Sequence, residues 1–312
     1  MELNNFLFND NVISTVKQYL ANPTGSVVLF GEKGLGKHIL ARQIAMHLLN
    51  VDENELNIHP DFLEVSSSNR VIKTCDLDLI RELIGLSCVD AKRKVFIIDD
   101  ANLMTLTAQN SLLKMLEDMN EKAVFILVCH EKILQTIESR CCKIKMVPLP
   151  LEQVSQFISK TSVVDELAIA LSGGCIGTYF RYLQKPDFLS VVHRFYDVFH
   201  LKSVRKMLTA LSMLKEKDGK NFFERFEIDE IRSFMQMLSD VLNEVLFHVT
   251  FGKSFYHLFS EFVNLDEASK QFSSLEILAL QKILREHIMR INQKGIYTKN
   301  DFFDLIRHFE GG

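Results

Sequence analysis

Short apolar runs alternate with amphipathic helical segments through the first 150 residues of the chain. Five of these runs have the continuous apolar character of strands that are buried on both faces of a sheet. The predicted strands are residues 27–30, 62–65, 95–99, 124–128 and 143–147. The segments between them place apolar residues at spacings of three and four, which indicates crossover helices. This part of the chain is therefore predicted to be an α/β domain with a parallel sheet.

The apolar spacing becomes helical beyond residue 148. Pro148 and Pro150 interrupt the chain at the change of pattern, and Pro186 is the last proline. An all-helical arrangement is the simplest structure for the remaining sequence, which contains few glycines. We expect three parts: an α/β P-loop domain at 1–148, a small helical domain at 149–186 and an all-helical domain at 187–312.

Composition narrows the class of protein. Hydrophobic residues make up 47% of the chain and charged residues 24%, which is typical of a globular protein. No apolar run approaches the roughly 18 residues that span a bilayer, and the first residues lack the pattern of a secretory signal, so we expect a cytoplasmic protein without membrane contact. The net charge of -4 excludes a chain that binds DNA through its overall charge. The six cysteines form no C-x-x-C pair, so no zinc is expected.

The segment after the first predicted strand carries the clearest chemistry. Gly31, Gly34, Gly36 and Lys37 lie in a G-x-x-x-x-G-K pattern, in which backbone N–H groups wrap a phosphate and the lysine reaches the β and γ phosphates. His38 follows, where a Ser or Thr hydroxyl would hold Mg²⁺, and imidazole is a poor ligand for that hard ion. The loop either still holds a phosphate or keeps its glycines only for the turn. Catalysis at this site is disfavoured.

Two carboxylates end the predicted strand at 95–99. Asp99 would lie over the metal position beside the P-loop, at the carboxyl edge of the sheet. Asp100 stands where a hydrolysing enzyme usually has glutamate to polarise the attacking water, and its side chain is one methylene shorter. Alternatively, the two carboxylates only cap the segment that follows.

A lone arginine precedes the last predicted strand, in Ser139-Arg140-Cys141. An arginine in such a loop is usually a solvated surface residue. In an assembly of P-loop domains, Arg140 could instead reach the γ-phosphate of a neighbouring subunit as an arginine finger.

Residues 94–147 resemble the AAA+ clamp-loader family. The stretch AQNSLLKMLED at 108–118 is similar to the NALLKTLEEP stretch that follows the acidic strand in that family, and Ser139-Arg140-Cys141 matches its SRC motif. His59-Pro60-Asp61-Phe62 is more similar to delta-prime subunits than to the ATP-hydrolysing gamma/tau subunits. The resemblance covers about residues 1–185.

The resemblance implies a clamp-loader subunit of DNA polymerase III with a RecA-like P-loop domain, a helical lid at 149–186 and an oligomerisation collar at 187–312. Such a subunit lends Arg140 to a neighbouring gamma/tau ATPase subunit, associates with the delta subunit, and meets the sliding clamp and primed DNA indirectly. It hydrolyses no ATP itself and requires no cofactor or metal, although ATP or ADP could be bound without turnover.

Several departures from the family pattern support a degenerate nucleotide site. Cys129 and His130 stand where an ATPase would carry a sensor Thr or Asn. A second sensor arginine is expected after Gly173-Gly174, but Gly177-Thr178 do not supply it and Arg181 comes a few residues late. The segment at 50–58 lacks the cysteines of the zinc module that relatives often carry. Two alternatives remain, an active AAA+ ATPase and a purely structural scaffold of a DNA replication complex.

Overall fold

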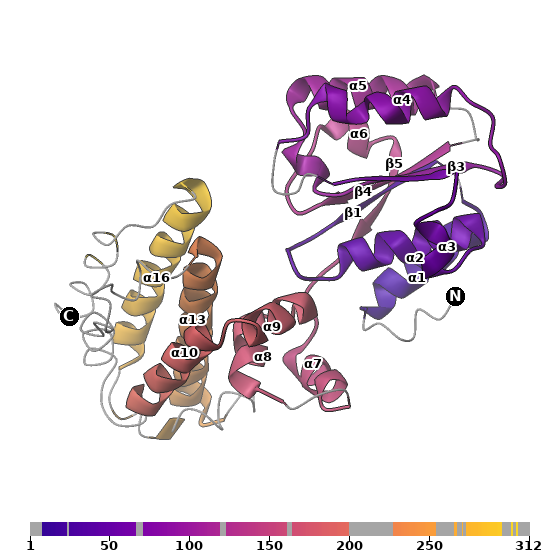
Figure 1. Ribbon diagram of the computed structural model, residues 1–312. Helices are drawn as coiled ribbons and strands as arrows, with labels where there is room; N and C mark the ends of the chain where they lie inside the picture. The colour runs from indigo at the N-terminus through magenta and orange to yellow at the C-terminus, as the bar shows by residue number, and fades with distance from the viewer. Residues whose placement is uncertain are drawn as a thin grey trace. The chain divides into compact units, whose positions relative to one another are not determined.

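The computed structural model describes most of the N-terminal half of the chain and parts of the C-terminal half (Figure 1). The described residues are 8–23, 25–66, 71–118, 123–160, 164–199, 227–253, 265–266, 270, 273–294, 301 and 304. The chain divides into two compact units, Met1–Leu149 with Cys175–Gly177, and Pro150–Gly174 with Thr178–Gly312. The three-part division into 1–148, 149–186 and 187–312 stays a prediction.

A parallel sheet of five strands in the order β2-β3-β4-β1-β5 forms the centre of the first unit. The strands are β1 (Ser26–Phe30), β2 (Phe62–Val65), β3 (Lys94–Ile98), β4 (Ala123–Cys129) and β5 (Cys141–Lys145). The predicted α/β fold is therefore confirmed. The predicted last strand at 143–147 was placed two residues too late, because β5 pairs with β1 from Cys141 onward. Strand β3 ends one residue before Asp99, which the sequence had placed inside the strand.

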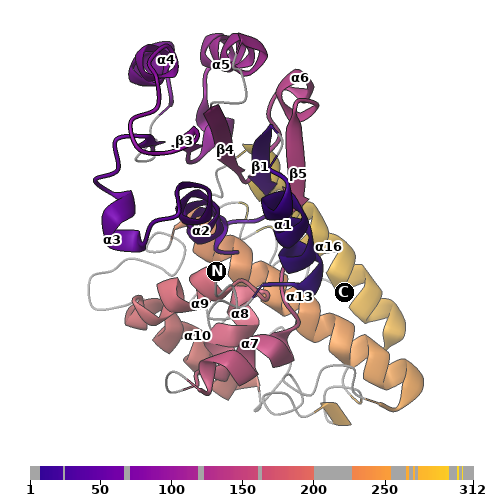
Figure 2. The same ribbon diagram turned by 90° about the vertical axis from the view of Figure 1, so that its right-hand side faces the viewer.

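Helices cover both faces of this sheet (Figures 1 and 2). One face carries α1 (Asp10–Ala21), α2 (Lys37–Leu49) and α3 (Glu53–Leu56), and the other carries α4 (Asp78–Ile84), α5 (Leu106–Asp118) and α6 (Gln135–Glu138). Short 3₁₀ turns lie at η2 (Thr74–Leu77) and η3 (Ala101–Leu103). Successive side chains of a strand point to opposite faces, so Val27 and Leu29 pack toward α2, whereas Val28 packs toward α5. Because helices cover both faces of the sheet, the central strands carry apolar side chains on both faces.

The described part of the second unit is helical. It contains α7 (Leu151–Ile158), α8 (Glu166–Ser172), most of α9 (Ile176–Leu183), α10 (Pro186–Phe199), α13 (Ile228–Phe251) and α16 (Ser274–Lys294). Helix α13 packs against α16 and α8. Gly173 ends α8 with a left-handed backbone. The parts of the predicted C-terminal domain at 200–226, 254–264 and 305–312 lie outside the described residues. Among the helices that the structure describes, none is both long and apolar enough to cross a membrane.

Candidate functional site

The P-loop connects β1 to α2, as the glycine pattern predicts. At Gly31 a Cβ atom would overlap the Met146 carbonyl oxygen, so a larger residue would displace the neighbouring backbone. Gly36 caps α2 with φ 78°, a left-handed conformation that glycine adopts without strain. Helix α2 therefore points its free N–H groups into the loop, which is the backbone arrangement that binds phosphate.

Lys37 is buried in the loop that it follows. Its Nζ donates hydrogen bonds to the carbonyl oxygens of Gly31, at 2.9 Å, and Glu32, at 2.5 Å. Burial lowers the pKa of Lys37, and the carboxylates of Asp99 and Asp100 partly oppose this change. The ammonium group thus folds back onto the backbone of its own loop.

His38 bonds to a carboxylate of the sheet. Its Nε2 lies 2.5 Å from Oε1 of Glu64, on β2. This hydrogen bond is the main cause that raises the pKa of His38. The second carboxylate oxygen of Glu64 accepts a bond of 2.7 Å from Nη1 of Arg42, one turn further along α2. Burial alone would raise the pKa of Glu64, but the bonds from His38 and Arg42 outweigh burial and lower it.

Asp99 and Asp100 follow β3 at the carboxyl edge of the sheet, as predicted. The Asp99 N–H donates to the Val65 carbonyl at 2.8 Å, and its carboxylate accepts the Asp100 N–H at 3.0 Å. Burial raises the pKa of Asp99, and His38 opposes that rise. Asp100 has a left-handed backbone, with φ 50°, and its carboxylate lies 3.3 Å from Nδ1 of His130. The histidine in the sensor position therefore faces the second carboxylate.

The first turn of α9 reaches the P-loop within the first unit. The Gly177 N–H donates to the Gly34 carbonyl at 2.9 Å, and a Cβ at Gly177 would come within 3.0 Å of that oxygen. Thus one carbonyl near the tip of the P-loop is bonded to backbone that is distant in the sequence.

Arg140 lies apart from these residues, directly before β5 as predicted. Its Nη2 donates to Oε1 of Glu117 at 2.7 Å, and its Nη1 donates to the Thr136 carbonyl at 3.0 Å. The Arg140 side chain is 41% exposed. Two nitrogens of the guanidinium are thus fixed by the chain, and the group stays open to solvent.

A buried ion pair that the sequence did not indicate joins Asp61, directly before β2, to Lys94, the first residue of β3. The Asp61 side chain is fully buried and lies 3.0 Å from Nζ of Lys94. It also accepts backbone N–H bonds from Val89, Asp90 and Ala91. Burial alone would raise the pKa of Asp61, but these donors hold it well below its usual range. This pair connects β2 and β3 and has a structural role.

Sequence reasoning also missed Glu64 and Arg42. The sequence contained one indication of Glu64's role, a single carboxylate in an otherwise apolar strand, because a charge in a sheet covered on both faces needs a partner.

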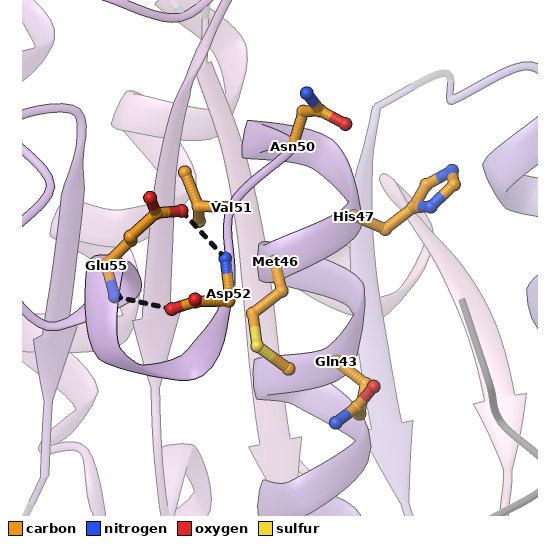
Figure 3. A pocket seen from close by; sticks show the side chains of 7 residues that line it. All are labelled: Gln43, Met46, His47, Asn50, Val51, Asp52 and Glu55. Carbon is orange, nitrogen blue, oxygen red and sulfur yellow. Dashed lines mark hydrogen bonds between the residues drawn. The ribbon is translucent and has the colours of Figure 1, made fainter.

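A shallow depression of about 390 Å³ lies between α2 and α3 (Figure 3). Two carboxylates there, Asp52 and Glu55, are engaged in the capping box of α3. That depression lies near the other end of α2 and does not extend the P-loop site.

The residues of the site fit phosphate and do not fit magnesium. The backbone of the P-loop and the N-terminus of α2 retain the geometry that receives an anion. In place of a hydroxyl, an imidazole that is already bonded to Glu64 follows Lys37. Within the described ranges, no group of three or more His, Cys, Asp or Glu side chains is arranged to hold a metal ion. The arrangement can accept an anion but lacks the oxygen ligand expected for a magnesium nucleotide.

Comparison with known proteins matches the first unit to one family. The family model described as "DNA polymerase III, delta subunit" matches residues 9–150. The chain is 32% identical to the DNA polymerase III subunit delta' of Pseudomonas aeruginosa over 174 residues, 47% of this chain and 52% of that protein. It is 26% identical to a replication factor C small subunit of Haloarcula marismortui, over 55% of this chain and 52% of that protein. The chain thus spans about half the length of these relatives.

Among solved structures, the chain is similar to a DNA polymerase III gamma subunit-related protein of Thermotoga maritima. The identity is 18% and the TM-score is 0.44, with 96% of this chain and 98% of the other covered.

Proposed function

Residues 9–150 belong to the DNA polymerase III delta-prime and clamp-loader small subunit family, and on that premise we propose that this chain is a loader subunit without ATPase activity of its own. It supplies Arg140 to a neighbouring gamma/tau ATPase subunit and assembles with the delta subunit. The complex loads the sliding clamp on primed DNA. In this proposal residues 149–186 form a lid and residues 187–312 a collar that joins the subunits. The protein works in the cytoplasm and requires no zinc.

The bond between His38 and Glu64 is the main support for the proposal that this chain has no ATPase activity of its own. In an active site of this type, the residue after the P-loop lysine offers an oxygen to Mg²⁺, and the metal neutralises charge on the transferred phosphoryl group. Here that residue is an imidazole with a carboxylate partner. A nucleotide held by the backbone of this loop would lack the metal, and its γ-phosphate would stay uncleaved.

The geometry of Arg140 supports the proposal that this residue acts in the site of a neighbouring ATPase subunit. Glu117 and the Thr136 carbonyl fix Nη2 and Nη1, while the side chain remains 41% exposed. An arginine carries five N–H donors, so it can keep both contacts and still present N–H groups to a phosphate of another subunit. Fixing the guanidinium in advance reduces the entropy lost when it meets the developing charge of the transition state.

The proposed mechanism uses this chain as a fixed component. ATP in the neighbour's site favours the state of the complex that opens the clamp, and hydrolysis shifts the population to the state that releases it on DNA. Arg140 stabilises the charge that develops on the γ-phosphate during that hydrolysis. The chain's own P-loop stays unchanged through the cycle.

The proposal is tested by ATP hydrolysis with the purified chain, first alone and then mixed with gamma/tau and delta subunits from the same cell. We expect no turnover by the chain alone and hydrolysis in the mixture that rises when the chain is added. Robust turnover by the isolated chain would assign it to the active ATPases.

Replacement of Glu117 by glutamine tests the positioning of Arg140. The amide keeps the size of the side chain but loses the charge-assisted bond to Nη2, so we expect hydrolysis by the mixture to fall about tenfold, which is ~1.4 kcal/mol in the barrier. The stability of the chain should change by less than about 1 kcal/mol, because the pair is at the surface. An unchanged rate would show that the Glu117 contact does not position the guanidinium.

A further inference from the structure

The first turn of α2 and the ends of β2 and β3 form one charged cluster. In the register of the sheet, Glu64 lies beside Ile97, and alternation places Asp99 on the same face as Ile97. Ile97 belongs to the core under α2, so Glu64 and Asp99 both point to the face that α2 covers. His38 lies in the first turn of that helix and bonds to Glu64 there. The ring therefore lies at the edge of the sheet where a metal ion beside a P-loop would be coordinated.

Both oxygens of Glu64 are occupied by side chains of α2. Oε1 bonds to His38, and Oε2 accepts Nη1 of Arg42, four residues later on the same helical face. Arg42 is itself fixed, because Nε donates to Glu53 at 2.8 Å and Nη2 donates to Asn57 at 2.7 Å. The Arg42 side chain is 15% exposed and Glu64 is 20% exposed. This set of five residues, His38, Glu64, Arg42, Glu53 and Asn57, is called the α2 network below.

We propose that the α2 network takes the place of the magnesium ion in this P-loop and excludes divalent cations from it. It supplies the N–H groups that face Glu64 at the sheet edge, and its contacts tie the first turn of α2 to β2. A divalent ion would have to break the bond between His38 and Glu64, and would then find no hydroxyl at position 38. The inference rests on the proposed function, because it explains why this subunit does not hydrolyse ATP.

The network has a second consequence for the fold. In a P-loop that depends on a metal nucleotide, the bound ligand stabilises the folded chain by mass action. Here the contacts between α2 and β2 are made entirely by the chain. The stability of the wild-type chain in the presence of ATP should therefore be independent of Mg²⁺.

Thermal unfolding of the full chain, with ATP and either Mg²⁺ or EDTA, tests the inference. For the wild type we expect equal midpoints in the two conditions. The variant His38→Thr removes the ring and supplies a hydroxyl, so we expect Mg²⁺ with ATP to raise its midpoint by about 3 °C or more over ATP with EDTA. The matched variant His38→Ala removes the ring without a new oxygen ligand and should show no such difference.

Each outcome decides the inference. A midpoint of the wild type that rises with Mg²⁺ would overturn it, and so would a His38→Thr variant that gains nothing or a His38→Ala variant that gains as much. Titration of the unmodified chain with Mn²⁺, followed by its electron paramagnetic resonance signal, needs no variant and should show no binding at the P-loop. None of these results changes the expected role of Arg140, which is tested separately by hydrolysis in the complex.

Discussion

Replacement of Arg140 by alanine is expected to lower ATP hydrolysis by the reconstituted complex by about 10³-fold or more. The physical reason is the loss of a guanidinium that is fixed by Glu117 and the Thr136 carbonyl, remains open to solvent, and in the proposed complex meets the neighbour's γ-phosphate. The loss should appear in the turnover number, because a finger acts on charge that develops in the transition state. Steady-state hydrolysis at saturating ATP measures it.

Two further variants serve as controls for the Arg140→Ala result. Arg140→Lys keeps the charge but loses the planar fork of donors, so we expect it to recover little of the activity. Lys143→Ala removes another exposed cation of the same segment, which is paired with Glu138 at 3.1 Å, and should leave the rate unchanged. A complex with Arg140→Ala that hydrolyses ATP as fast as the Lys143→Ala complex would favour the purely structural scaffold.

Replacement of Asp61 by asparagine is expected to lower the free energy of unfolding by about 3–5 kcal/mol. The change leaves the buried Lys94 ammonium without its carboxylate and places an amide against three backbone N–H donors. Urea denaturation measures the effect. Asp90→Asn makes the same change in charge at an exposed carboxylate and should cost less than about 0.5 kcal/mol. Equal stabilities of the two variants would contradict the structural role of Asp61.

The same ion pair predicts a dependence of stability on pH. The folded chain holds the pKa of Asp61 well below its ordinary value, so the folded state favours the charged carboxylate. Its contribution is fully present above the unfolded pKa of about 3.9 and is lost as the pH falls toward the lower folded value. The free energy of unfolding of the wild type should therefore decrease at pH values below about 4. The Asp61→Asn variant should lack the part of this decrease that comes from Asp61. Urea midpoints across that pH range measure the difference.

The sheet was predictable because its strands are short apolar runs between turns. All five were found from the sequence, and the error at β5 has a physical cause. Strand β5 lies at the edge of the sheet, and its limits are set by where β1 begins to pair with it. The hydrogen bond from Met146 to the Phe30 carbonyl continues past the strand, at 2.8 Å. Only the partner strand fixes such a boundary, so the sequence of β5 alone does not contain it.

The sequence was sufficient to predict the P-loop motif of the candidate site, but not the residues that its side chains contact. The glycine pattern located the P-loop, and the chemistry of imidazole predicts that His38 does not bind magnesium. What His38 does instead depends on Glu64, 26 residues later, which lies beside α2 only after β2 has joined the sheet next to β3. Arg140 was placed correctly before β5, yet its contact with Glu117 depends on how α5 packs on the sheet. Contacts between distant segments come from the fold.

The role of Arg140 can be measured by single-turnover hydrolysis of ATP that is already bound to the neighbouring ATPase subunit. Complexes are assembled with either the wild-type chain or Arg140→Ala, and both the bound ATP and its cleavage are followed. We expect equal ATP occupancy, rapid cleavage with the wild-type chain and uncleaved ATP with the variant. Cleavage at the wild-type rate in the Arg140→Ala complex would mean that Arg140 is not an arginine finger.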